Sequence, residues 1–63
     1  MNYQELTERL EAFYGEGDVQ NALETAILAR EAAAKEYGKE HDNYLESLNN
    51  LGYLYATVNE YEQ

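Results

Sequence analysis

The sequence predicts an all-α chain of three helices, and its composition and the spacing of its apolar residues carry that prediction. The 63 residues include no proline and only four glycines, and they are rich in the strong helix formers Ala, Leu and Glu. Glycines and short polar clusters interrupt the helical spacing of apolar residues at two places. We therefore expect one domain over residues 1–63, with helices near residues 3–14, 18–37 and 43–58.

The first helix is expected to begin after Asn2, a residue that suits the N-cap position, and Glu5 follows as in a capping box. It is expected to end near Tyr14, before the sequence GEG. Its apolar residues recur at helical spacing and predict a buried face made of Tyr3, Leu6, Leu10 and Phe13.

The second helix is expected to be capped by Asp18 and closed by Gly38, because glycine adopts the left-handed conformation of a helix end at low cost. Its predicted inward stripe consists of Val19, Ala22, Leu23, Ala26, Ile27, Ala29 and Ala33. So many alanines allow a neighbouring helix to approach closely. Because the connecting loops are short, neighbouring helices should be antiparallel, and the sequence predicts a stack of helical hairpins.

The third helix is expected to begin with Asp42 or Asn43 as its cap. Its predicted buried stripe is Leu45, Leu48, Leu51, Gly52, Tyr55 and Val58. A glycine inside a helix costs about 1 kcal/mol relative to alanine, so a compensating contact is expected. We expect Ile27 or Tyr37 of the second helix to pack against Gly52, in which case Gly52→Leu would disrupt the packing.

The sequence also contains an internal repeat with an offset of 42 residues. At this offset Tyr3 aligns with Leu45, Leu6 with Leu48, Phe13 with Tyr55 and Val19 with Tyr61. The first and third helices are therefore predicted to be the same element of consecutive repeats. The sequence NEYEQ at residues 59–63 matches the start of a second copy of GDVQNA.

The stretch SLNNLGYLYATVNEYEQ resembles the tetratricopeptide repeat through Leu48, Leu51, Gly52 and Tyr55. The upstream run GDVQNALETAILAREAAAKEYGKEHDNYLESLNNLGYLY resembles the longer, kinesin light chain-type variety. The 42-residue offset agrees with that variety better than with the ordinary repeat of about 34 residues. Two departures mark the ends of the chain. Arg9 and Leu10 stand where the pattern has Leu and Gly, and Asn43 stands where proline is common.

The resemblance implies a tetratricopeptide-like hairpin stack of about one and a half repeats, whose first helices line a concave groove that binds peptides. It implies a scaffold or adaptor with protein or peptide partners and no catalytic role. Helical spacing puts Glu46, Asn49, Asn50, Tyr53 and Thr57 on one face, and the offset adds Gln4, Thr7, Glu8 and Glu11. The candidate peptide-binding residues are Asn49, Asn50, Tyr53, Glu46, Thr7, Glu8 and Glu11.

The candidate residues suggest which peptides would bind. The amides of Asn49 and Asn50 both donate and accept hydrogen bonds, which suits an extended peptide backbone, and Tyr53 adds a flat surface. Alternatively, the asparagines bridge adjacent helices or face water. Repeats that clamp the acidic tails of heat-shock chaperones need lysine or arginine on this face, and here Glu8 and Glu11 stand there instead. We therefore expect a neutral or basic ligand.

Several function classes are disfavoured by the sequence. Thirteen acidic against four basic residues give a formal charge of −9, which repels nucleic acid and anionic lipid. With no cysteine and no long apolar stretch, we expect a cytoplasmic chain that does not span a membrane. His41, flanked by Glu40 and Asp42, lacks the converging geometry of a metal site and is expected to serve the loop or a cap. We expect no catalytic residue, cofactor or metal.

Self-association is the alternative function. Because arrays usually need at least three repeats for stability, the chain is expected to be a piece of a longer array or a homo-oligomer. One version of the oligomer opens the loop YGKEHDN into a continuous helix and exchanges the third helix between chains. The sequence identifies neither the parent protein, nor the number of repeats, nor the ligand.

Overall fold

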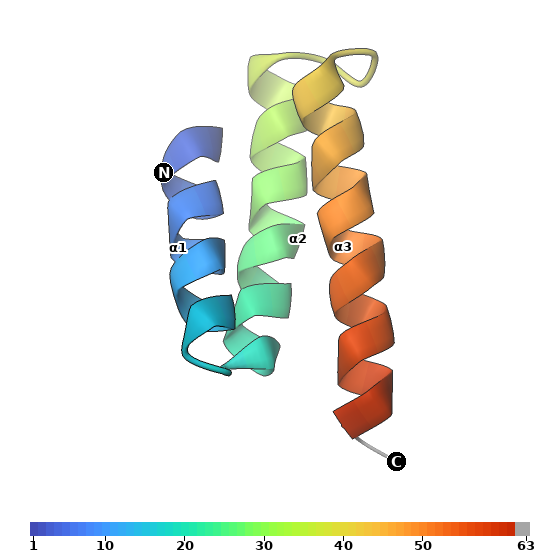
Figure 1. Cartoon of the computed structure of the whole chain (residues 1–63). Coiled ribbons are helices and arrows are strands. Elements are labelled where there is room, and N and C mark those ends of the chain that lie inside the picture. The colour runs from blue at the N-terminus through green and yellow to red at the C-terminus, as the bar shows by residue number, and fades with distance from the viewer. Residues whose placement is uncertain (62–63) are drawn as a thin grey trace.

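The structure is a computed structural model and describes residues 1–61 of the 63-residue chain. It contains helices α1 (Tyr3–Gly15), α2 (Val19–Glu36) and α3 (Asp42–Tyr61). Neighbouring helices run antiparallel, and α2 lies between α1 and α3 (Figure 1). The all-α hairpin stack predicted from the sequence is confirmed. The proposed restart of the repeat at NEYEQ extends into residues 62–63, outside the described residues.

Each helix begins at a side chain that accepts a hydrogen bond from its first turn. The backbone N–H of Glu5 donates to Asn2 Oδ1 at 2.8 Å, and that of Asn21 donates to Asp18 Oδ1 at 3.3 Å, as predicted for the first two caps. For α3 the cap is His41, whose Nδ1 accepts from the backbone N–H of Asn43 at 3.0 Å. The prediction of Asp42 or Asn43 as this cap is wrong, because α3 already begins at Asp42.

Two glycines make the turns between the helices possible. Gly17 and Gly38 have φ of 80° and 91°, a region that other residues rarely adopt. The N–H of Gly38 donates to the carbonyl of Ala34 at 3.1 Å and so satisfies the end of α2. The predicted left-handed role of Gly38 is confirmed.

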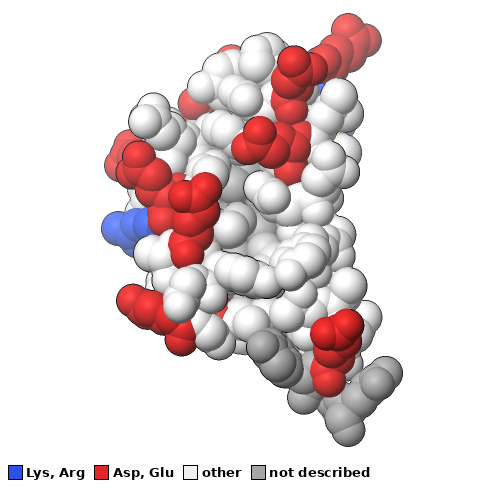
Figure 2. All heavy atoms as spheres, viewed as in Figure 1, with Lys and Arg blue, Asp and Glu red and all other residues white. Residues whose placement is uncertain are grey.

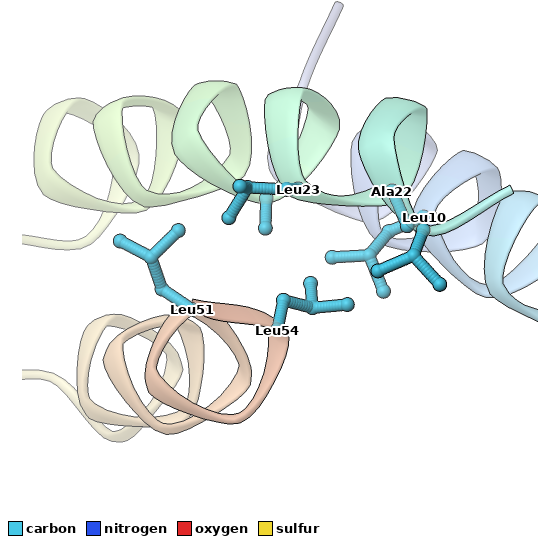
Figure 3. Close-up of a cluster of buried hydrophobic side chains, with 7 residues drawn as sticks. Leu10, Ala22, Leu23, Leu51 and Leu54 are labelled. Atoms are coloured by element: carbon cyan, nitrogen blue, oxygen red, sulfur yellow. The ribbon is translucent and has the colours of Figure 1, made fainter. Parts of the chain in front are cut away.

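The core forms where α2 is buried on two sides. Its alanines leave room for both neighbours, and Leu51 and Leu54 of α3 point toward Leu23 of α2 and Leu10 of α1 (Figure 3). The first cluster of buried residues is Leu10, Val19, Ala22, Leu23, Ala26, Leu51 and Leu54. The second consists of Tyr3, Leu6, Ala29 and Ala33. Helix α2 therefore holds α1 and α3 side by side.

The buried face of α3 differs from the predicted one. Its buried residues are Ser47, Leu51 and Leu54, flanked by the half-buried Tyr44 and Val58. The predicted members Leu45, Leu48 and Tyr55 are 50%, 39% and 48% exposed, and Gly52 is exposed as well.

The physical reason is that α3 carries two series of residues with the same spacing, one residue apart. The first is Tyr44, Ser47, Leu51, Leu54 and Val58, and the second is Leu45, Leu48, Gly52 and Tyr55. The polar residue Ser47 interrupts the apolar pattern of the first series. Its hydroxyl donates to the carbonyl of Tyr44 at 2.6 Å, however, so the buried polar group is satisfied within the helix.

The predicted close contact at Gly52 is also wrong. A Cβ at this position would meet no side chain and no neighbouring helix within 4 Å, so neither Ile27 nor Tyr37 packs against it. Gly52→Leu is accordingly no longer expected to disrupt the core.

The open surroundings of Gly52 lead to a prediction about stability. In dilute solution, Gly52→Ala should raise the free energy of unfolding by about 1 kcal/mol, because alanine is the better helix former. Urea denaturation followed by circular dichroism measures the change. The matched control is Gly38→Ala, which should lower stability by about 1–2 kcal/mol because its φ is left-handed. A loss of stability in Gly52→Ala would contradict the prediction.

Candidate functional site: a groove between α1 and α3

Side chains of α1 and α3 meet in front of α2 and enclose a shallow groove with two hollows. The tyrosine hollow, of about 370 Å³, is lined by Leu10, Glu11, Tyr14, Gly15, Asn50, Tyr53 and Leu54. The acidic hollow, of about 280 Å³, is lined by Tyr3, Gln4, Thr7, Glu8, Glu11, Tyr37 and Asn43. Glu11 belongs to both, so the two hollows adjoin each other. Figure 2 shows a hollowed, uncharged area with carboxylates around it.

The tyrosine hollow is bridged by two phenol groups from different helices. The hydroxyls of Tyr14 and Tyr53 are 2.7 Å apart and share a hydrogen bond, and their ring centroids are 5.8 Å apart. Leu10 and Leu54 are both buried and give the hollow an apolar floor. Tyr53 is still 61% exposed, so its ring offers surface to a ligand.

The acidic hollow lies at the other end of the groove and is built around Tyr3. The phenol of Tyr3 donates to Glu46 Oε1 at 3.3 Å and so links α1 to α3. The backbone N–H of Tyr3 donates to Glu36 Oε2 at 2.8 Å, which places a carboxylate at the positive end of the α1 dipole. Glu8 and Glu11 are exposed at the rim. Among the described residues, no lysine or arginine lines either hollow.

Burial raises the pKa of the Tyr3 phenol above its ordinary value of about 10. The hydroxyl of Thr7 offsets part of this shift, and the nearby carboxylate of Glu46 adds to it because a second negative charge is unfavourable there. The folded chain therefore holds the phenol proton that bonds to Glu46 more tightly than the unfolded chain does.

The structure brings most of the predicted site residues together. Five of them line the two hollows: Thr7, Glu8, Glu11, Asn50 and Tyr53. Glu46 reaches the groove through its bond to Tyr3, whereas Asn49 is exposed and lines neither hollow. The hydroxyl of Thr7 donates its hydrogen bond to the carbonyl of Tyr3 at 2.9 Å, so its proton is not available to a ligand.

Some groove residues were missed by the sequence reasoning. Leu54 was missed because the buried face of α3 was misplaced. Tyr14 was missed because the 42-residue offset pairs it with Ala56, which is not aromatic. A signal did exist, since Tyr14 follows Glu11 by three residues and so shares its face of α1.

Metal binding and membrane insertion each require a particular arrangement of residues. Within residues 1–61, no group of three or more His, Cys, Asp and Glu side chains could hold a metal ion. No helix in the same part of the chain is long and apolar enough to cross a membrane.

The groove is framed by α1 and α3, and a family model described as tetratricopeptide repeat matches residues 3–63. The chain belongs to the tetratricopeptide repeat family. A tetratricopeptide repeat is a protein–protein interaction unit. Searches of curated proteins and of solved structures each found no match. The kinesin light chain-type variety stays a prediction.

The raised pKa of Tyr3 predicts how the stability of this tetratricopeptide chain changes in alkali. Above about pH 10 the unfolded chain loses the Tyr3 proton before the folded chain does, so the free energy of unfolding falls as the pH rises. Tyr3→Phe should remove this part of the fall. Urea denaturation from about pH 8 to about pH 11 measures it, with Tyr55→Phe as the exposed control. An equal slope in wild type and Tyr3→Phe would contradict the assignment.

Proposed function

We propose that this tetratricopeptide chain is a scaffold module that holds an extended neutral or basic peptide in the groove between α1 and α3. The observation that carries the proposal is the composition of the groove, in which an apolar, tyrosine-bridged hollow adjoins a rim of carboxylates. Peptide sites combine apolar pockets with a few polar groups that fix the backbone, and both are present here.

The tyrosine hollow supplies the apolar pocket. An aliphatic or aromatic side chain seated there would contact the rings of Tyr14 and Tyr53 and cover the floor formed by Leu10 and Leu54. The hydrogen bond between the two phenols holds the rings in place before the ligand arrives, which reduces the entropy lost on binding. The amide of Asn50 lies at the edge and can both donate to and accept from a peptide backbone.

The carboxylates supply the charge preference. Glu8 and Glu11 at the rim would attract a lysine or arginine that follows the apolar residue along the peptide. The formal charge of −9 acts in the same direction at longer range, because it steers basic segments toward the chain and repels acidic ones. A ligand with an acidic tail would bring a third negative charge beside these two glutamates.

The remaining parts of the proposal rest on the sequence. They are that the module binds rather than catalyses, that it works in the cytoplasm, and that nucleic acid is not a partner.

Self-association is a second candidate, and the exposed apolar side of α3 favours it. The helix-swapped version is less favoured. It requires residues 37–41 to become helical, which the left-handed Gly38 and the His41 cap both oppose.

The test is a titration with two sets of fluorescent peptides that share an apolar residue and differ only in charge. Basic peptides should bind more tightly than acidic ones, and added salt should reduce the difference. Tyr53→Ala should weaken binding about tenfold, equivalent to about 1.4 kcal/mol, because it removes one wall of the hollow. Glu11→Gln should reduce the preference for basic peptides.

The matched control is Leu28→Ala, which alters an exposed leucine on α2 outside both hollows and should leave affinity unchanged. A preference for acidic peptides would overturn the proposed charge specificity. Wild-type affinity in Tyr53→Ala would place the ligand outside the groove.

A further inference from the structure

The bridge between Tyr14 and Tyr53 places two oxidisable side chains in direct contact at the surface. Their hydroxyls are 2.7 Å apart, their ring centroids are 5.8 Å apart, and their ring planes are inclined by 55°. Two phenols placed end to end would have centroids farther apart than this, so the rings lean toward each other beside the hydrogen bond. A ring carbon next to one hydroxyl therefore lies near the corresponding carbon of the other ring.

The composition of the chain directs oxidation to tyrosine. The side chains that give up electrons most readily are those of cysteine, tryptophan, tyrosine and methionine. The sequence contains no cysteine, no tryptophan, one methionine and seven tyrosines. Tyr14 and Tyr53 are 40% and 61% exposed, so an oxidant can reach both from solvent and water can take up their protons. An electron removed from this chain therefore comes mainly from tyrosine.

The arrangement of Tyr14 and Tyr53 differs from that of the other tyrosines. Tyr3 and Tyr37 have ring centroids 5.9 Å apart, but they meet edge-on at 85°, and the phenol of Tyr3 donates to a carboxylate instead. Tyr55 is 48% exposed and makes no ring contact within residues 1–61. In the part of the chain that the structure describes, Tyr14 and Tyr53 are thus the two tyrosines whose phenols are hydrogen-bonded to each other.

We propose that Tyr14 and Tyr53 are an oxidative cross-linking site, at which a one-electron oxidant such as the activated haem of a peroxidase joins the two rings as dityrosine. Each phenol loses one electron to the oxidant and one proton to water, and so becomes a neutral phenoxyl radical. The two radicals combine by forming a carbon–carbon bond between ring positions next to the oxygens. The hydrogen on each bonded carbon then moves to the oxygen of its own ring and restores the phenol. In total the pair loses two electrons and two protons, and two equivalents of oxidant accept the electrons.

Contact within one chain favours this coupling over coupling between chains. The hydrogen bond, together with the docking of α1 and α3 on α2, holds the two rings beside each other during the short lifetime of a radical. This contact raises the effective concentration of one ring at the other. Two copies of the chain repel each other, because each carries a formal charge of −9. The cross-link should therefore form within single chains, at a yield that does not depend on protein concentration.

The cross-link has a structural consequence. It ties α1 to α3 across 39 positions of sequence and closes a long loop, which restricts the unfolded chain. The cross-linked chain should therefore resist unfolding more strongly than the unmodified one. The inference does not rest on the proposed peptide binding, because it needs only the two phenols and an oxidant.

The first experiment oxidises the purified chain with a light-generated ruthenium(III) complex, which accepts one electron at a time. The blue fluorescence of dityrosine should appear in chains of monomer size, and their mass should fall by that of two hydrogen atoms. Trypsin cleaves after lysine and arginine, so it should leave fragments 10–30 and 40–63 joined, and Tyr14 is the only tyrosine in the first of them. Tandem mass spectrometry should place the other end of the link at Tyr53.

The yield of joined fragments per chain should stay constant between about 1 μM and about 100 μM protein, because the coupling is intramolecular. Consumption of tyrosine without these joined fragments overturns the proposal. So does a product found only in chains of dimer size.

Two variants assign the cross-link to this pair. Tyr53→Phe keeps the ring but cannot form a phenoxyl radical, so it should lower the yield of joined fragments at least about tenfold. The matched control is Tyr55→Phe, which removes another exposed phenol two residues away and should leave the yield unchanged. An unchanged yield in Tyr53→Phe, or an equal loss in both variants, would refute the assignment.

Urea denaturation then measures the effect of the link on stability. The cross-linked chain, separated from the unmodified chain, should unfold at a higher urea concentration, because its closed loop loses less entropy on folding. Oxidised Tyr53→Phe should unfold at the same midpoint as before treatment. A midpoint that the link leaves unchanged or lowers would contradict the claim that dityrosine fits the folded arrangement.

Discussion

The alanine stripe of α2 is the constraint on which the rest of the molecule depends. Ala22 and Ala26 are almost completely buried in the cluster that also holds Leu10 of α1 and the α3 leucines. Because alanine adds little beyond the backbone, two helices can pack on α2 at the short end of the usual interaxial distance of about 8–10 Å. A larger side chain at Ala22 or Ala26 would push α1 or α3 outward and change the width of the groove.

The two ends of the groove are held in different ways. At the acidic hollow, Tyr3 contacts Tyr37 edge-on with ring centroids 5.9 Å apart, and Tyr37 stacks on His41 at 4.7 Å. This aromatic chain joins the start of α1, the end of α2 and the start of α3. His41 also caps α3, so one ring orients both the loop and the helix. At the tyrosine hollow, by contrast, the hydrogen bond between Tyr14 and Tyr53 crosses from α1 to α3 in front of the apolar floor.

The sequence predicted α1 and α2 well because each has one apolar series, and the caps at Asn2 and Asp18 follow simple side-chain chemistry. It misplaced the buried face of α3 because two series compete there. The exposed series begins with Leu45 and Leu48, whereas the buried series contains the polar Ser47. Periodicity alone cannot rank two faces of similar hydrophobicity, since the choice depends on which face fits α2.

The misplaced buried face of α3 also explains which groove residues were predicted correctly and which were not. Moving the buried face by one residue rotates α3 by about 100°, which moves the groove face in the same direction. Tyr53 and Asn50 lie far enough from the boundary to remain in the groove, whereas Asn49 is displaced from it. The partnership of Tyr14 with Tyr53 depends on the distance between two helices, which no local pattern in either helix encodes.

The bond between Tyr14 and Tyr53 joins residues 39 positions apart, and neither hairpin alone contains both. The proposed binding site therefore exists only when α1 and α3 are docked on α2 at the same time. In a chain of this size, whose core is marginal, the detachment of either outer helix abolishes the site. A bound ligand must accordingly stabilise the whole fold by RT ln(1 + [L]/Kd), so that occupancy of the groove and the integrity of the chain are thermodynamically linked.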